Sequence, residues 1–187
     1  MPVDILVNKT KVENPPLEVH HLGDRVLRQA AKRIAKVDDE VRLLVRKMLQ
    51  TMYSEDGIGL AAPQVAVNKQ LLVIDVNYED PTTPPLVMVN PVIQALGGDN
   101  VLFEEGCLSV PNVFFEVRRP ELVTVAYRDE MGRPQKLIAD GILGRVIQHE
   151  IDHLNGVLFV DRVENKLALT QELAKQKFSP SAVQSLV

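Results

Sequence analysis

The strongest constraint on the fold is a pair of histidines, His149 and His153, in the pattern His-Glu-x-x-His. Apolar residues recur around them at helical spacing, and we expect a helix over residues 140–156, with Asp140 as its N-cap and Gly156 as its stop. Residues four apart on a helix lie one turn above the other, with Cβ atoms about 5–6 Å apart. Two imidazoles placed in this way can share one metal ion.

The glutamate between the histidines occupies an unusual place for a charged side chain. On a helical wheel, Glu150 falls inside the apolar arc, between Val146 and Leu154. Burial there costs free energy unless the carboxyl finds a partner, and it raises the pKa of the carboxyl. A pKa near neutrality suits a group that takes and returns a proton. Asp152 lies on the opposite side of the wheel, and we assign it no role.

A third ligand would decide the type of metal site, and the residues leave several candidates open. The metzincin pattern requires a histidine where Phe159 stands, and phenylalanine cannot bind a metal. Thermolysin-type zinc proteases use a downstream glutamate, for which Glu164 and Glu172 are available. Upstream, the only cysteine, Cys107, offers a thiolate, a strong ligand for zinc or iron(II). Two histidines and one thiolate would leave a fourth position for water, as in catalytic sites.

The remaining segments mix helices and short strands without regular alternation. Helices are expected over residues 38–54 and 165–177, and a hairpin turn over 129–134. Strands are expected over 71–76, 86–90, 122–127, 136–139 and 157–160, and a Gly/Ala-rich turn over 57–64. This mixture favours an α+β fold over a doubly wound sheet. We expect short mixed or antiparallel sheets packed around the central histidine helix, with a C-terminal helix.

Length and composition bound the class of protein. The 187 residues suffice for one domain, 1–187, with an extended arm at 1–18 and a frayed tail at 178–187. The net charge of -4 argues against nucleic-acid binding. No apolar run approaches the ~20 residues needed to span a bilayer, and no secretory signal is evident. A single cysteine fits a reducing compartment. We expect a cytoplasmic monomer without membrane contact; an organelle stays open if a targeting segment was removed.

Three short motifs together resemble the peptide deformylase family. They are Gly-Ile-Gly-Leu-Ala-Ala-Pro-Gln at 57–64, Glu-Gly-Cys-Leu-Ser at 105–109 and Gln-His-Glu-Ile-Asp-His-Leu at 148–154. Each motif alone is moderately specific, and the three in this order and spacing are very specific. The resemblance runs from about Val19 to Val163, so the arm and the tail lie outside it.

The resemblance implies an enzyme that removes the formyl group from the N-terminal formylmethionine of newly made polypeptides, which it would meet at the ribosome exit, and releases formate. It also implies one Fe²⁺ ion per chain, bound by Cys107, His149 and His153, with Zn²⁺, Ni²⁺ or Co²⁺ as possible substitutes. In the implied mechanism, metal-bound water attacks the formyl carbon while Glu150 serves as general base and then general acid.

The same resemblance implies further site residues. The Gln64 side-chain amide and the Leu108 backbone N–H would donate to the oxyanion, and Gly59 would let the backbone approach and contact the substrate. A pairing of Glu105 with Arg119 would brace the Cys107 loop. Apolar residues near the histidines are candidates for the slot that holds the methionine side chain: Ile58, Phe103, Ile142 and Val146.

The sequence is also compatible with two other classes of function. The alternative enzyme is a zinc endopeptidase of the His-Glu-x-x-His kind, which needs a downstream third ligand and leaves Cys107 dispensable. The non-enzymatic alternative is a metal-stabilised binding module, in which Glu150 would be dispensable.

Overall fold

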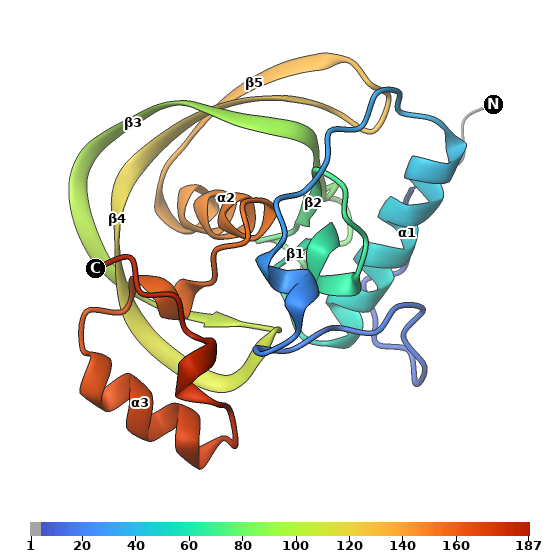
Figure 1. Cartoon of the computed structure of the whole chain (residues 1–187). Helices are drawn as coiled ribbons and strands as arrows, with labels where there is room; N and C mark the ends of the chain where they lie inside the picture. The colour runs from blue at the N-terminus through green and yellow to red at the C-terminus, as the bar shows by residue number, and fades with distance from the viewer. Residues whose placement is uncertain (1–4) are drawn as a thin grey trace.

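The computed structural model describes residues 5–187, and the first four residues of the expected arm lie outside this range (Figure 1). The α-helices are α1 (Asp39–Ser54), α2 (Gly141–Leu154) and α3 (Lys166–Lys175). The strands are β1 (Gly59–Ala61), β2 (Leu71–Ile74), β3 (Leu86–Cys107), β4 (Val110–Arg128) and β5 (Pro134–Ala139). Short 3-10 helices are η1 (Arg25–Arg28), η2 (Ala62–Val65), η3 (Phe159–Arg162) and η4 (Pro180–Ala182).

The strands form one antiparallel sheet in the order β1-β2-β3-β4-β5. The long strands β3 and β4 pair with several register shifts and curve around α2, as Figure 1 shows. Such irregularities bend a strand and increase its twist, which lets one sheet wrap a helix. The fold is therefore α+β, with an antiparallel sheet around a central helix, as the sequence predicts.

The short strand β2 is buried on both faces and separates two core clusters. Leu71 and Val73 pack with the cluster of α1, whereas Leu72 and Ile74 pack with the cluster of α2. Successive side chains of a strand point to opposite faces, so four consecutive apolar residues serve both helices. This arrangement fixes β1 and β2 between α1 and α2.

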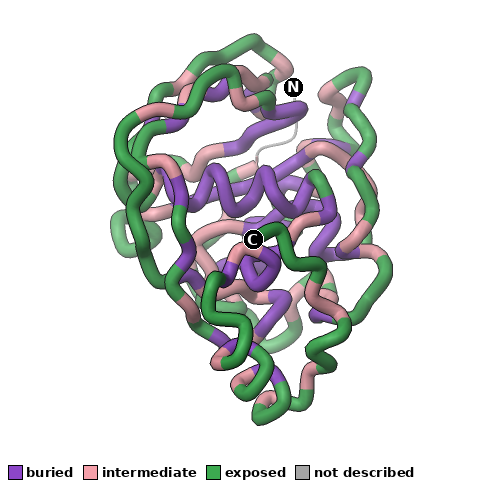
Figure 2. The backbone as a smooth tube through the Cα atoms, turned by 60° about the vertical axis from the view of Figure 1, so that its left-hand side comes forward, coloured by how far each residue is buried: buried purple, intermediate pink, exposed green. Residues whose placement is uncertain are grey.

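The helix that carries the histidine pair lies inside the protein. All residues of α2 from Gly144 to Leu154 are buried, and Figure 2 shows the buried residues gathered in the middle of the molecule. Gly144 permits close packing, because a Cβ there would lie 2.8 Å from the backbone oxygen of Ala139. Within residues 5–187, no helix is both long and apolar enough to cross a membrane.

Helix α1 follows from its sequence as expected. Val41, Val45, Met48 and Met52 are buried on one face, and the Asp38 carboxylate accepts a hydrogen bond from the Val41 N–H at 3.1 Å. A side-chain acceptor at the N-cap satisfies one of the free amide groups of the first turn.

Some expected strands differ from the structure. The segment 157–160 is not a strand: Gly156 ends α2 with a φ of 74°, and the Asp161 carboxylate accepts the Leu158 N–H at 2.8 Å, which favours the turn of η3. The apolar residues of segment 157–160 suggest a strand, but they are apolar because most of them are buried in the core. Strands β3 and β4 extend far beyond the expected 86–90 and 122–127, because exposed side chains and bulges hide their alternation. The segment 57–64, expected as a turn, contains β1 and part of η2.

The C-terminal residues, expected to fray, are held against the domain. The backbone N–H of Gln184 donates to the Asp161 carboxylate at 2.8 Å, and Arg28 donates to the Ala182 oxygen at 2.6 Å. Phe178 and Val183 pack against the core cluster under α3. The polar composition of the tail conceals these contacts, which all come from distant parts of the chain.

Candidate metal centre

Three potential ligand atoms converge between α2 and the end of β3. The Cys107 sulfur and one ring nitrogen each from His149 and His153 lie within 4.8 Å of one another. The two ring centroids are 5.0 Å apart, and the Cys107 Sγ lies 3.3 Å from His153 Nε2. Both histidines are buried and Cys107 is half-buried. One thiolate and two imidazoles in this proximity fit a divalent metal such as zinc or iron(II).

The downstream glutamates do not approach this group. Glu164 accepts a hydrogen bond from Arg118 at 2.9 Å, and Glu172 binds Lys175 and Gln176 on its own helix. Phe159 instead stacks on His149, with ring centroids 6.1 Å apart. Among the residues that the structure describes, Cys107 is thus the side chain placed to complete the ligand set.

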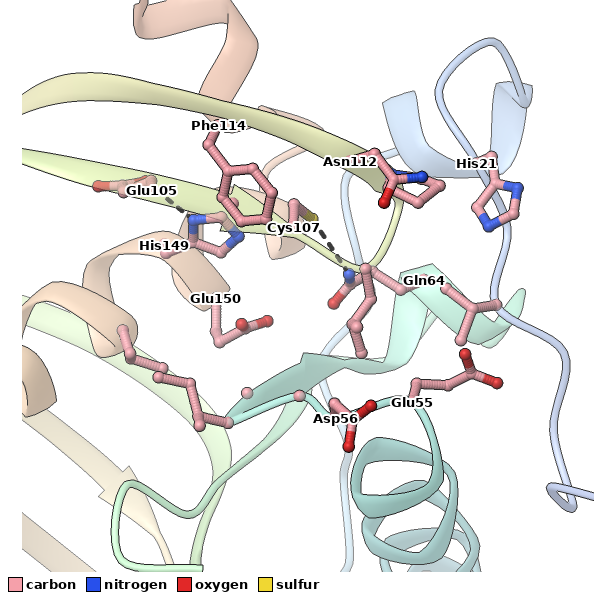
Figure 3. A pocket seen from close by; sticks show the side chains of 18 of the residues that line it. His21, Glu55, Asp56, Gln64, Glu105, Cys107, Asn112, Phe114, His149 and Glu150 are labelled. Atoms are coloured by element: carbon pink, nitrogen blue, oxygen red, sulfur yellow. Dashed lines mark hydrogen bonds and ion pairs between the residues drawn. The ribbon is translucent and has the colours of Figure 1, made fainter. Parts of the chain in front are cut away.

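Glu105 fixes the orientation of His149. The Glu105 Oε2 lies 2.9 Å from His149 Nδ1, so the Nδ1–H can donate to it and leave Nε2 free to bind a metal (Figure 3). The predicted pairing with Arg119 is confirmed, with Nε–Oε1 and Nη2–Oε2 distances of 2.6 and 2.9 Å. Arg145 Nη1 also donates to Glu105 Oε1, at 3.0 Å. Burial alone would raise the pKa of Glu105, but hydrogen bonds from Arg119 and His149 hold this pKa well below its ordinary value.

The two histidines experience opposite electrostatic effects. Burial alone would lower the pKa of His149, but its hydrogen bonds to Cys107 and Glu105 raise this pKa well above the ordinary value. Burial, and then the positive charges of His149 and Arg119, hold the pKa of His153 well below its ordinary value. His153 is therefore neutral, which is the form of histidine that binds metals.

Asp152, to which the sequence assigned no role, belongs to this network. Its carboxylate is buried and accepts hydrogen bonds from Arg119 Nη1 at 2.7 Å and from Arg162 Nε and Nη2, both at 2.7 Å. The helical wheel placed Asp152 opposite the apolar arc of α2, but that side of the helix faces β4 and η3 rather than solvent. A series of hydrogen bonds thus connects Asp152 to Arg119, Arg119 to Glu105, and Glu105 to His149, and it fixes the orientation of the His149 ring.

Glu150 is buried as predicted, with 3% of its surface exposed. Its Oε2 has no hydrogen-bond partner within residues 5–187, and burial raises the pKa of its carboxyl to about 7. Space for this carboxyl depends on Gly59, where a Cβ would contact Glu150 Oε1 and lie 2.8 Å from Val146 Cγ1. A buried carboxyl with this pKa is suited to exchanging a proton near neutral pH.

Gln64 presents its amide group to the same centre. Its Oε1 accepts the Ala61 N–H at 2.8 Å, which orients the side chain. Its Nε2 then points toward the Ser109 hydroxyl at 3.1 Å and the Cys107 sulfur at 3.5 Å (Figure 3). The next residue after Cys107, Leu108, lies beside it at the cavity.

A cavity of about 1150 Å³ opens onto these side chains. Of the candidate catalytic, metal-binding and methionine-pocket residues that the sequence singles out, His153 alone is not part of its lining. The predicted apolar pocket residues Ile58, Phe103, Ile142 and Val146 all line it, together with Gly59 and Glu150. Residues 15–19, at the end of the arm and its junction with the domain, also line the cavity, which nothing in the sequence indicated.

Sequence and structure comparisons agree with one another over most of the chain. Residues 16–168 match the model of a family described as polypeptide deformylase. A peptide deformylase of Microchaete diplosiphon is 62% identical over 183 residues, which cover 98% of each protein. The crystal structure of a peptide deformylase from Synechococcus elongatus in complex with actinonin has a TM-score of 0.97 at 60% identity, covering 98% of this chain and 100% of that chain. A peptide deformylase from Legionella pneumophila has a TM-score of 0.80 at 40% identity, covering 86% and 95%.

Proposed function

The chain belongs to the peptide deformylase family, and we propose that it removes the formyl group from the N-terminal formylmethionine of newly made polypeptides, releasing formate. The observation that carries this proposal is the convergence of Cys107, His149 and His153 beside the buried carboxyl of Glu150. All but His153 face one cavity, so a substrate in the cavity can reach the ligand set and the proton acceptor together.

Cys107, His149 and His153 would hold one divalent metal ion, which we propose to be Fe²⁺. Thiolate and imidazole donors suit iron(II) and also zinc, so the donor set is compatible with either ion. When bound, the metal supplies Lewis acidity, which lowers the pKa of water and polarises a carbonyl oxygen. Glu105 supports the site by holding His149 through its Nδ1.

Glu150 would carry the proton during the reaction. Its carboxylate would accept a proton from the water that attacks the formyl carbon, and the resulting carboxylic acid would then protonate the leaving amine. Its raised pKa, about 7, makes both protonation states accessible near neutrality. Because Oε2 has no hydrogen-bond partner among the described residues, it is available to accept and then donate this proton.

Gln64 and Leu108 would stabilise the negative charge that develops on the formyl oxygen. The Gln64 Nε2 already points toward Cys107, and its Oε1 is held by the Ala61 N–H, so the amide donor is oriented before substrate binds. The Leu108 backbone N–H would be the second donor. A preorganised donor of this kind typically lowers the barrier by about 2.7–4 kcal/mol.

Four apolar residues would hold the methionine side chain. Ile58, Phe103, Ile142 and Val146 come from β1, β3 and α2 or their borders and line the same cavity as Glu150. Gly59 lies against Glu150 and Val146, where its backbone would contact the substrate and a side chain would intrude.

The proposal is tested by measuring formate release from a formyl-Met tripeptide, with the protein prepared without oxygen and its metal content determined on the same sample. We expect formate and free amine in equal amounts, with about one metal ion per chain. A metal-loaded protein that releases no formate would contradict the proposal. Cleavage of internal peptide bonds without formate would indicate the endopeptidase alternative.

A further inference from the structure

Lys9, on the arm before η1, is bound in a seat of oxygen atoms at the end of β2. Its ammonium lies 2.7 Å from the Asp75 carboxylate and donates to the backbone oxygens of Asp80 and Thr83 at 2.9 and 2.7 Å. The Lys9 side chain is 11% exposed and the Asp75 side chain 2%. Asp75 also accepts the Tyr53 hydroxyl at 2.7 Å. A lysine with this many acceptors is fixed in place, unlike an ordinary surface lysine.

From this seat the arm follows α1 through hydrogen bonds along the helix. Gln50 donates to the Thr10 oxygen at 2.9 Å, and the Val12 N–H donates to the Ser54 hydroxyl at 3.1 Å. After two prolines, the Leu17 N–H donates to the Thr51 hydroxyl at 3.2 Å. Apolar side chains at alternate positions pack on the cluster of α1: Ile5, Val7, Leu17 and Val19. The arm is thus docked over its described length.

The docked arm ends as part of the cavity that holds the candidate metal ligands. Residues 15–19 line this cavity, and Leu17 and Val19 pack in the same cluster as Leu108. The seat of Lys9 is also linked to the cavity, because the Asp75 N–H donates to the backbone oxygen of Ile58 at 2.9 Å. The family match begins only at residue 16, so Lys9 lies outside it.

The cavity is larger than formylmethionine alone requires. Its volume of about 1150 Å³ exceeds the roughly 300–1,000 Å³ of pockets that enclose drug-sized ligands. The apolar residues assigned to methionine lie with Glu150 around α2. Glu55, Asp56 and His21, near the arm, are drawn in Figure 3 on the side away from Glu105 and His149. This part of the cavity is therefore available for the peptide that follows the methionine.

We propose that residues 15–19, where the arm joins the domain, form a substrate-binding wall for the peptide beyond the formylmethionine, and that Lys9 is the positioning residue that holds the arm in place. The inference rests on the proposed function, since it concerns the same reaction and the same cavity. Glu18 is an exposed acidic side chain of this wall and lines the cavity, as do Glu55 and Asp56. A basic residue of the substrate is the complementary partner for it.

The test compares Lys9→Met with wild type on two substrates, formyl-Met-Ala and a formyl-Met-Ala-Lys-Ala peptide. For the longer peptide, we expect kcat/KM to fall about threefold to tenfold through a higher KM, as for the loss of one or a few weak contacts. For formyl-Met-Ala, the value should stay within about twofold of wild type. Lys47→Met, which removes an exposed lysine of α1, is the matched control and should leave both values unchanged.

The short substrate separates a binding wall from a purely structural role. The segment directly after the arm also donates from the His20 backbone N–H to the Gln64 backbone oxygen and from the Leu22 N–H to the Ser109 backbone oxygen, both at 2.8 Å. If the arm only supported these segments, Lys9→Met would lower kcat equally for both peptides, and the inference would be overturned. An unchanged KM for the longer peptide would also overturn it.

Glu18→Gln tests the wall without disturbing the Lys9 seat. Because Glu18 is exposed, this variant should fold like wild type even if Lys9→Met does not. We expect it to raise KM for formyl-Met-Ala-Lys-Ala about threefold and to leave formyl-Met-Ala unaffected. Equal KM values for variant and wild type on both peptides would overturn the inference. Absence of formate from both substrates with the wild-type protein would instead overturn the proposed function, and this inference with it.

Discussion

The Glu105 carboxylate and the His149 imidazole are joined by a 2.9 Å contact between Oε2 and Nδ1, in the interior of the protein. Glu105 is held in turn by Arg119, and Arg119 by Asp152. These residues come from β3, β4 and α2, so the orientation of one ring depends on three elements. With Nδ1 directed at Glu105, Nε2 is the ring nitrogen of His149 left to contact Cys107 or a metal ion.

The contact predicts that Glu105→Gln weakens metal binding. Glutamine offers one acceptor oxygen in place of two and carries no charge, so it cannot hold the His149 Nδ1–H and Arg119 together as the carboxylate does, and Arg119 keeps Asp152 as its acidic partner. Removal of a partner that orients a metal ligand typically lowers affinity about 10–100-fold. Chelator competition on the zinc-loaded protein measures this change. Glu116→Gln, at an exposed position of β4, is the matched control, and equal affinities of the two variants would contradict the prediction.

Replacement of Glu150 by glutamine should separate turnover from metal binding. The amide has nearly the same shape but cannot accept the proton of the attacking water. Formate release should therefore fall by about a hundredfold to ten-thousandfold, the usual contribution of a general base. Metal content and melting temperature should stay near wild type. A variant that kept its rate would favour the non-enzymatic binding module, or another base.

Cys107→Ala should abolish both metal retention and activity. The substitution removes one of the three candidate ligand atoms, and Glu164 and Glu172 are bound elsewhere. The measurement is metal content after gel filtration, together with formate release. Full metal content and turnover in the variant would instead support the endopeptidase alternative, in which the cysteine is dispensable.

The parts of the site that follow local spacing could be predicted, and the parts that depend on distant contacts could not. The helical period alone places His149 and His153 together and Glu150 in the apolar arc. Asp152 shows the limit of a helical wheel. The wheel gives the direction in which a side chain leaves its own helix, but it does not show which other elements of the fold lie on that side. Arg119, which binds Asp152, comes from β4, whose length is concealed by bulges and exposed side chains.

The contribution of the arm was hidden for a similar reason. Residues 15–19 carry no signal of chemistry, and their position follows from Lys9 reaching Asp75, far along the chain. The polar tail is likewise held by hydrogen bonds with two distant residues, Arg28 and Asp161. Such contacts between distant residues leave no periodic pattern in a sequence, whereas helices and short motifs do.

Gly59→Ala should reduce activity with little loss of fold. An added Cβ would contact the Glu150 carboxyl and lie 2.8 Å from Val146 Cγ1, so the Glu150 side chain must shift. A displacement of about 1 Å in a reacting group can cost a hundredfold in rate. We expect a loss of about this size in kcat, with the metal retained. An alanine variant with wild-type kcat would show that Glu150 tolerates the displacement.

The turn between β4 and β5 predicts a pH-dependent stability that is independent of the metal centre. The Asp129 carboxylate accepts the backbone N–H groups of Met131 and Arg133, both at 2.9 Å, and the Gln135 amide at 3.0 Å. Burial alone would raise the pKa of Asp129, but these hydrogen bonds, with the Arg133 side chain, lower it below its ordinary value. A carboxyl with a lowered pKa stabilises the folded state above its unfolded pKa, about 3.9, and loses this effect as pH falls through the folded value.

Asp129→Asn should therefore lower the free energy of unfolding by about 1.5–3 kcal/mol at pH 7, the range for hydrogen bonds to a charged group. The difference from wild type should be constant from about pH 7 to 5 and should shrink below about pH 4, as the wild-type carboxyl becomes protonated. Urea unfolding at a series of pH values measures it. Glu130→Gln, which removes a charge from the same turn and leaves the Asp129 hydrogen bonds intact, is the control. A difference for Asp129→Asn that grows toward low pH would have the wrong sign for a stabilising carboxylate, and would show that the turn does not depend on its charge.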